Sequence, residues 1–335
     1  MMIKVMSAAF AAMTALAALS APVWEDPAIN EENRLPPRAY TVPEDGDWTM
    51  SLNGTWRYWW CGGVDQQPQD FMKVGFDDSR WFEIDVPSCV EMRGWGIPHY
   101  TNQRYPHKKD PPRIGTEYNP VSSYIKRFTL SDSWKGRRTV LRFDGVYSCH
   151  WVWVNGKYIG YSEDSKLPSE FDITAALVAG ENTLAVRVYR WCDGSYMEDQ
   201  DMFRYSGIFR DVSLWSRPKG GIWDFAVRTK LSAQSQRHAV RADEIAGELS
   251  VDGIDGEWSA KLYDADKRLV ASAEAQGSAL SVRLDKVYLW SAEKPYLYTL
   301  VITKGGDIRA KRIGFKDQRI EGNPILVNGM PVKCK

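Results

Sequence analysis

Short runs of β-branched and aromatic residues, each closed by a turn signal, recur along most of this chain. The clearest example is Asn155-Gly156, which lies between the runs 151–154 (Trp-Val-Trp-Val) and 158–161 (Tyr-Ile-Gly-Tyr). Both central residues of a type I′ turn need a positive φ, which Asn-Gly tolerates, so this segment predicts a β-hairpin. Helical periodicity is almost absent beyond the N-terminal segment, so we predict an all-β fold.

The first predicted domain spans residues 48–218, where β-type runs alternate with turns at close spacing. Its clearest runs are residues 139–143, 149–154 and 183–189. Such spacing is typical of an antiparallel sandwich. Residues 22–47 are proline-rich and acidic with little periodicity, and we expect them to form an extended arm over this domain.

A boundary is predicted at Pro218-Lys219-Gly220-Gly221, because proline and glycine interrupt regular structure. Residues 219–322 predict a second domain, with alternating runs at 222–229, 258–263 and 297–302. About one hundred residues of short, regularly spaced strands favour an immunoglobulin-like sandwich, and the absence of a Cys-Trp-Cys pattern excludes the antibody type. Residues 323–335 read as a hairpin-like turn and a strand.

The composition excludes some classes of partner. The chain has 43 basic and 43 acidic residues, so it lacks the basic surplus of a nucleic-acid-binding protein or of an electrostatic membrane anchor. Most of the 15 tryptophans and 16 tyrosines are expected in sandwich cores, where aromatic rings supply much of the buried area. The five cysteines are scattered and predict no disulfide framework: they are Cys61, Cys89, Cys149, Cys192 and Cys334.

Residues 1–21 read as a secretory signal peptide. Lys4 supplies the positive start, residues 5–19 form a short apolar run rich in alanine, and Ala18, Ser20 and Ala21 offer a cleavage site. The run is too short to span a membrane comfortably, and no other segment is a candidate span. We therefore expect an exported protein, periplasmic or extracellular.

The segment 198–212 carries four carboxylates, two arginines and two phenylalanines without a simple period. Its acids come first, and an apolar and basic run follows the break at Ser206-Gly207. Two interpretations stay open: a loop that brings acids to a site, or a salt-bridged loop that stabilises itself.

Read with its flanks, this segment resembles the β-galactosidase branch of glycoside hydrolase family 2. Other segments resemble the same family and occur in its order along the chain. The matching segments are residues 33–38, 51–56, 100–106, 160–172, 190–212 and 289–298. The resemblance implies a jelly-roll, galactose-binding-like domain at 48–218 and an immunoglobulin-like domain at 219–322. It also implies that residues 323–335 begin a linker into a catalytic TIM barrel, which is missing from this chain.

The resemblance also bears on catalysis. Retaining glycosidases use two carboxylates that flank the scissile bond, and this family places both, as glutamates, in the barrel. No residue of this chain matches them, so we assign no catalytic residue. The pair Glu198 and Asp201 is not nominated, since the resemblance gives Asp201 another role.

Two substrate-binding residues follow from the resemblance. Asn102 matches an asparagine that reaches into the galactose pocket, and Asp201 matches an aspartate that contacts a galactosyl hydroxyl and ligates a sodium ion. Amides and carboxylates suit these partners. The alternatives are a turn residue for Asn102 and an ion pair of Asp201 with Arg204 or Arg210. His99 and His107 flank the Asn102 loop and are candidates to line a pocket.

A second cation is implied for the first domain. Asp193 and Glu163 match ligands of a magnesium ion found in some members, although the family more often has glutamine at the position of Glu163. Asp164, Glu170 and Asp172 are interpreted as acids that stabilise loops.

We therefore predict the N-terminal, non-catalytic part of a β-galactosidase-like enzyme, whose full-length form hydrolyses terminal β-D-galactosides. We expect the chain to be inactive alone, to bind a galactoside or another glycan together with a barrel in cis or in trans, and to form a homo-oligomer. The alternative is a stand-alone exported carbohydrate-binding protein without catalysis.

Overall fold

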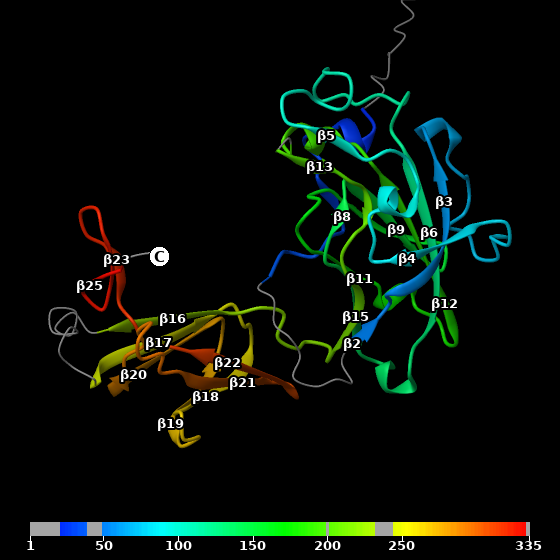
Figure 1. The fold of residues 1–335 in the computed structure, drawn as a ribbon. Coiled ribbons are helices and arrows are strands. Elements are labelled where there is room, and N and C mark those ends of the chain that lie inside the picture. Colours follow the sequence, from blue (N-terminus) through cyan, green and yellow to red (C-terminus); the bar gives the residue numbers. More distant parts are fainter. Residues whose placement is uncertain (1–20, 39–48, 199–200, 232–243, 333–335) are drawn as a thin grey trace, which may run out of the picture.

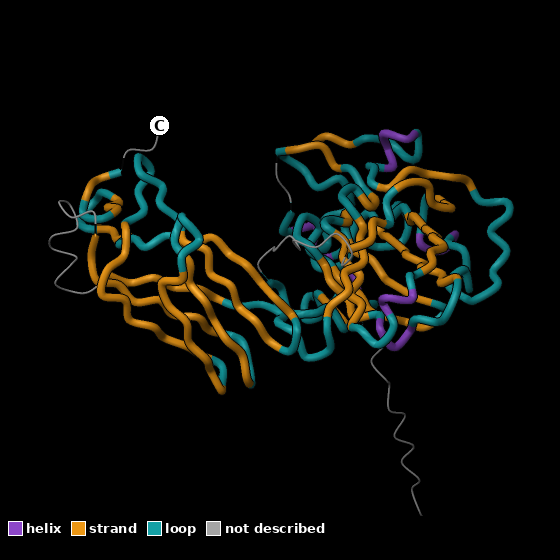
Figure 2. Tube along the Cα trace, turned by 90° about the horizontal axis from the view of Figure 1, so that it is seen from below, coloured by secondary structure: helices purple, strands orange, loops and turns teal. Residues whose placement is uncertain are grey.

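The computed structural model describes residues 21–38, 49–198, 201–231 and 244–332, which form two β-sandwiches joined near residues 218–221 (Figure 1). The described helices are short 3-10 turns, and all lie in the first sandwich (Figure 2). They are η1 (Val23–Glu25), η3 (Val64–Gln66), η4 (Val90–Arg93), η5 (Asp132–Trp134), η6 (Thr174–Ala176) and η7 (Asp193–Tyr196). The predicted all-β fold is confirmed.

A seven-stranded antiparallel sheet forms one layer of the first sandwich, in the order β1-β10-β9-β12-β6-β3-β4. Its strands are β1 (Glu31–Glu32), β3 (Gly54–Cys61), β4 (Phe82–Val86), β6 (Val121–Thr129), β9 (Cys149–Val154), β10 (Lys157–Ser162) and β12 (Glu181–Tyr189). The predicted hairpin joins β9 to β10, with φ of 50° at Asn155 and 78° at Gly156, so that prediction is confirmed.

The facing layer is a four-stranded sheet in the order β11-β7-β15-β2. Its strands are β2 (Thr49–Ser51), β7 (Arg138–Phe143), β11 (Ser169–Asp172) and β15 (Val212–Arg217). Alternate residues of both layers point into a shared core, because side chains of a strand alternate between its two faces. Val152 and Val154 of β9 meet Leu141 and Phe143 of β7 there.

Aromatic rings also cover the outer face of the large sheet. Trp153 packs against Phe71, which contacts Trp81, and Trp151 packs against Trp24 of the N-terminal arm. Much of the aromatic content is therefore used in packing on both faces of this sheet.

Two short ribbons extend the first sandwich. One pairs β5 (His99–Thr101) with β13 (Met202–Arg204), and the other pairs β8 (Val146–Tyr147) with β14 (Gly207–Ile208). Each ribbon contains one strand of the acidic segment 198–212, so this segment is attached to the first sandwich by two short strand pairings.

The second sandwich packs a three-stranded sheet, β16-β17-β20, against a four-stranded sheet, β19-β18-β21-β22. The strands are β16 (Ala226–Leu231), β17 (Glu244–Asp252), β18 (Glu257–Tyr263), β19 (Leu269–Gln276), β20 (Ala279–Tyr288), β21 (Tyr298–Lys304) and β22 (Asp307–Ile313). A separate small sheet follows, formed by β23 (Gln318–Ile320), β24 (Ile325–Val327) and β25 (Met330–Pro331).

One expected strand is shorter than predicted. The alternation of residues 222–229 predicts a strand throughout, but β16 begins only at Ala226. The preceding residues are used at the junction of the two sandwiches: the N–H of Ile222 donates to Asp307, and Trp223 packs against arginines of the first sandwich.

The junction contains a cation–π stack. The Arg38 guanidinium lies 4.9 Å from the ring centroid of Trp215 and 4.8 Å from that of Trp223, and Arg138 also lies 4.8 Å from Trp223. Arg38 is buried and ion-paired with Glu170 at 2.6 Å. Such desolvated contacts are worth about 2 kcal/mol or more each, so this stack fixes the arm and the linker against the first sandwich.

The predicted signal peptide lies outside the described residues, apart from Ala21, and it stays a prediction. Among the described residues, no helix is long and apolar enough to cross a bilayer.

Candidate functional site

The β5–β13 ribbon brings Asn102 and Asp201 to the same end of the first sandwich. The last residue pair of the ribbon is Thr101 and Met202. Asn102 follows Thr101 and Asp201 precedes Met202, so the two face each other just beyond that pair. Both side chains are exposed. Asn102 and Asp201, which are 99 positions apart in the sequence, are thus brought together by a ribbon of three residue pairs.

Exposed aromatic rings accompany this pair. The Tyr100 hydroxyl donates a hydrogen bond to Asp201, and this bond raises the pKa of Tyr100. The Tyr100 ring lies 5.4 Å from that of Phe203, which stacks on Tyr205 at 5.5 Å. Tyr100 and Phe203 are each exposed by more than half. The ribbon therefore offers an amide, a carboxylate and aromatic faces, the groups that bind a sugar.

A buried ion pair anchors the ribbon. The Glu91 carboxylate accepts from the N–H and hydroxyl of Ser206, at 2.9 and 2.6 Å, and lies 3.5 Å from Arg190 Nε. Arg190 in turn donates to the carbonyl oxygens of Arg204 and Ile97. Both sides of the ribbon are thus tied to one buried pair, which keeps Asp201 in place.

The Ser206-Gly207 break has a steric cause. Gly207 has φ of 103°, and a Cβ there would lie 2.7 Å from Val90 and 2.8 Å from the Tyr124 hydroxyl. Only glycine fits this turn from the ribbon into β14.

Other charged groups of the acidic segment stabilise loops. The Glu198 carboxylate accepts from the N–H and hydroxyl of Ser165, at 3.0 and 2.6 Å. Burial raises the pKa of Glu198, and the bonds from Ser165 oppose that shift. Arg204 and Arg210 donate to the backbone oxygens of Glu198 and Lys166. Glu198 is thus occupied in holding the segment.

A second cluster lies where the end of β10 meets the start of η7. Glu163 follows β10, Cys192 immediately precedes η7, and Asp193 is its first residue; their ligand atoms all lie within 4.8 Å of one another. All three are buried. Burial raises the pKa of both Glu163 and Asp193, and for Glu163 the neighbouring Asp193 charge adds to that rise.

The two implied cations fit these residues unequally. Two buried carboxylates suit a hard divalent ion such as Mg²⁺, whereas the thiol of Cys192 is not a ligand that Mg²⁺ prefers. At the sodium position, Asp201 offers one exposed carboxylate that already accepts from Tyr100. Asp201 would therefore supply one ligand of a sodium ion, and other residues would have to supply the remaining ligands.

His99 and His107 have different environments. His99 lies on β5 opposite Arg204. The His107 ring packs against Tyr105, Tyr196 and Trp191, so it supports the loop after β5 by aromatic contact.

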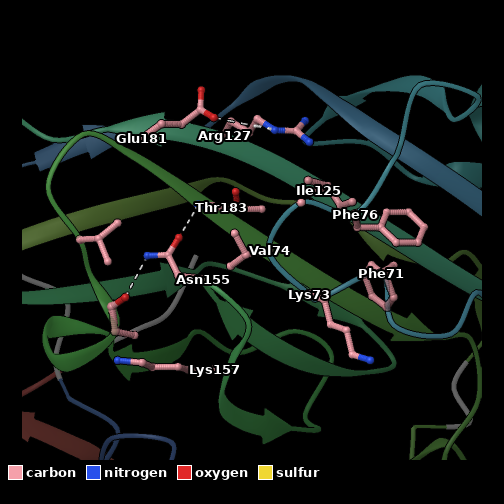
Figure 3. A pocket seen from close by; sticks show the side chains of 13 residues that line it. Phe71, Lys73, Val74, Phe76, Ile125, Arg127, Asn155, Lys157, Glu181 and Thr183 are labelled. Atoms are coloured by element: carbon pink, nitrogen blue, oxygen red, sulfur yellow. Dashed lines mark hydrogen bonds and ion pairs between the residues drawn. The ribbon is translucent and has the colours of Figure 1, made fainter.

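The described residues also form a pocket with a volume of about 400 Å³ at the other end of the large sheet (Figure 3). Arg127 and Glu181 lie on one side of it, and Lys73 and Lys157 lie on the other in that view. Phe71 in its wall is fully buried, with the Arg187 guanidinium over its ring. Phe76 also lines this pocket and is half-buried, so the pocket offers less exposed aromatic surface than the ribbon, where Tyr100 and Phe203 are exposed by more than half.

Sequence reasoning missed Tyr100, Phe203 and Cys192. The alternation within residues 99–101 and 202–204 is too short to signal a ribbon. Cys192 was classed among scattered cysteines, although its position next to Asp193 was a usable signal. The described cysteines, Cys61, Cys89, Cys149 and Cys192, are free thiols, whereas Cys334 lies outside the described residues.

Comparison with known proteins identifies both domains. The family model described as "Glycosyl hydrolases family 2, sugar binding domain" matches residues 49–218, and that described as "Glycosyl hydrolases family 2" matches residues 221–316. A β-galactosidase of Priestia megaterium is 39% identical over 301 residues, which are 84% of this chain and 29% of that enzyme. The chain thus spans less than a third of that relative's length.

Solved structures agree on the fold. A β-glucuronidase of an uncultured Clostridium sp. has a TM-score of 0.62 and 25% identity, covering 87% of this chain and 49% of that one. A β-glucuronidase of Lactobacillus rhamnosus has the same TM-score and identity, covering 88% and 49%. The matched domains are N-terminal domains of β-galactosidase- or β-glucuronidase-like hydrolases. Because family models match residues 49–218 and 221–316, this chain belongs to glycoside hydrolase family 2.

Proposed function

We propose that this chain is the non-catalytic N-terminal part of a β-galactosidase and forms one wall of its galactose pocket. The observation that carries the proposal is the β5–β13 ribbon, which places Asn102 beside Asp201 and surrounds them with exposed rings. Asn102 would donate to and accept from sugar hydroxyls, and Asp201 would accept from a hydroxyl.

The ribbon favours a neutral sugar over a glucuronide. A glucuronide carries a carboxylate, which the Asp201 carboxylate would repel at short range. The 39% identical relative is a β-galactosidase, which supports the same choice.

Cations complete the proposal. A sodium ion would bridge Asp201 and the bound sugar, with its remaining ligands supplied from outside this chain. A divalent cation would neutralise Glu163 and Asp193 and so hold η7 against the end of β10. Export, by the predicted signal peptide, and assembly into a homo-oligomer are proposed with it.

The acid and the nucleophile would come from a barrel, in cis or in trans. We expect no turnover of an aryl β-galactoside by the pure chain. Adding the remaining part of the Priestia enzyme, expressed separately, should give turnover that depends on this chain. Asp201→Ala should lower that turnover by about 10- to 100-fold, the value of one hydrogen bond to a charged group, and should abolish its response to sodium.

Two results would contradict this proposal. One is turnover by the homogeneous chain alone, and the other is an Asp201→Ala variant with unchanged rate and sodium response. Asp164→Ala is the matched control, because Asp164 is an exposed acid outside the ribbon. A preference for an aryl β-glucuronide would move the assignment to the glucuronidase branch.

The second candidate function is a stand-alone carbohydrate-binding protein. The exposed pair Tyr100 and Phe203 favours it, because a stacking surface can bind a sugar without a barrel. Titration of the isolated chain with galactosides, followed by tryptophan fluorescence, tests it. Millimolar or tighter binding that Phe203→Ala removes would support this function.

A further inference from the structure

We infer that the buried cluster of Glu163, Cys192 and Asp193 selects Zn²⁺ over Mg²⁺, because a thiol completes its donor set. The inference rests on the divalent-cation site proposed above and specifies which ion that site takes. It depends on chain-specific chemistry, since the ligands implied by resemblance include only the two acids.

The geometry suits a small tetrahedral ion. Three donor atoms that all lie within 4.8 Å of one another can share a centre at about 2.8 Å or less from each. Zinc bonds are about 2.3 Å to sulfur and about 2.0–2.2 Å to carboxylate oxygen. The cluster therefore needs to contract by only about half an ångström, within reach of side-chain rotation. Mg²⁺ instead requires six oxygens in an octahedron and retains several waters.

Burial favours the same choice. Cys192, Glu163 and Asp193 are exposed by 1%, 7% and 8%. Mg²⁺ loses its water reluctantly, whereas zinc needs only four ligands, of which one can be a water molecule. Glu163, Cys192 and Asp193 would supply three of these ligands, and a water molecule would take the fourth position.

Neighbouring groups already orient the donors. The Ser148 hydroxyl lies 3.1 Å from Cys192 Sγ and 3.1 Å from the hydroxyl of Ser195, which accepts from the Cys192 N–H at 3.0 Å. The Tyr161 hydroxyl donates to Glu163 at 2.5 Å. Such supporting bonds fix metal ligands in place and raise affinity.

Zinc binds the deprotonated forms of its ligands, so binding at Glu163, Cys192 and Asp193 would release to solvent any protons that these donors carry.

The test is metal binding by the full 335-residue chain after treatment with a chelator. Titration calorimetry should give a Zn²⁺ affinity greater than that for Mg²⁺ by on the order of 100-fold. Co²⁺, used as a coloured probe, should give a thiolate-to-metal charge-transfer band in the near ultraviolet.

Three variants separate the roles. Cys192→Ser should lose the Co²⁺ band and about 10- to 100-fold in Zn²⁺ affinity, with Mg²⁺ affinity unchanged. Glu163→Gln should weaken both ions. Cys89→Ser, at a free thiol outside the cluster, should behave as the parent. Circular dichroism of each variant confirms that it is folded.

Several outcomes would overturn the inference. Equal or tighter Mg²⁺ binding would refute zinc selection while leaving the proposed cation site intact. A Co²⁺ band that survives Cys192→Ser would exclude this thiol as a ligand. A Cys149–Cys192 disulfide in the purified protein, or no binding of either ion, would refute both the selection and the site, whereas the galactose-binding proposal is tested separately by turnover.

Discussion

Acid should destabilise the first sandwich through one buried histidine. His150 lies on β9 with its Nε2 3.1 Å from the Ser169 hydroxyl, and its ring packs between Phe143 and Phe171 at 5.2 and 6.0 Å. Nδ1 is buried without a hydrogen-bond partner among the described residues. Burial, with a smaller effect from the charge of Arg34, lowers the pKa of His150 to about 3.

The sign and size follow from this shift. An unfolded chain has a histidine pKa of about 6.5, so between pH 6.5 and pH 3 the unfolded state binds more protons than the folded state. Stability is therefore lost as the pH falls through this window. At pH 5, about 1.5 units below the unfolded pKa, the loss is about 2 kcal/mol at about 1.4 kcal/mol per unit. This is a large part of a typical stability of about 5–15 kcal/mol.

Urea unfolding at pH 7, 6 and 5, followed by tryptophan fluorescence, measures the effect. His150→Gln should be less stable at pH 7 and should lose about 2 kcal/mol less than the parent on going to pH 5. His99→Gln leaves His150 in place and should keep the parental pH dependence. If His150→Gln shows the parental pH dependence, the buried neutral histidine is not its source.

Substitutions at three further positions test the anchoring of the site and the junction. Glu91→Gln leaves Arg190 buried with a weakened partner and should cost about 3–5 kcal/mol in urea unfolding; an unchanged midpoint would mean that the pair does not stabilise the ribbon. Gly207→Ala should lower the melting temperature by several degrees, because a Cβ at this positive φ has no room. Trp223→Ala should cost about 2–4 kcal/mol, and Trp223→Phe less, because both reduce the stack with Arg38; equal stability of the two variants would count against that stack.

The strands of both sandwiches were largely predictable, because they follow local rules. The Asn155-Gly156 turn follows from its two residue types, and the runs that become β9 and β18 have the period of two that burial on alternate faces imposes. The run that becomes β7 does not alternate in this way, because it is buried on both faces. The error at residues 222–225 has the opposite origin. Ile222 and Phe225 are buried in the second core, yet a contact with Asp307, 85 positions later, draws this backbone out of the sheet. Local alternation holds no information about such a contact.

The candidate site was only partly predictable for a related reason. Asn102 and Asp201 were nominated through the family resemblance, whereas their juxtaposition depends on a ribbon with no detectable period. The rings beside them, Tyr100 and Phe203, could be recognised only once the pairing was known. Cys192 is adjacent to Asp193 in the sequence, but both meet Glu163 only because η7 packs at the end of β10, which no spacing in the sequence encodes.

The two interpretations of the acidic segment turn out to be compatible, because they concern different residues. Glu198 and Arg204 use their polar groups to hold the segment, one through Ser165 and the other through the Glu198 backbone. Between them, Asp201 remains exposed on the ribbon with Tyr100 as its partner. An exposed carboxylate keeps a fixed position only if contacts of the neighbouring residues offset the conformational entropy that is lost when the loop is ordered. A binding role for Asp201 thus depends on the hydrogen bonds that order the rest of the segment. Substitutions that remove the hydrogen bonds of Glu91 or Glu198 should therefore reduce sugar affinity before they unfold the chain.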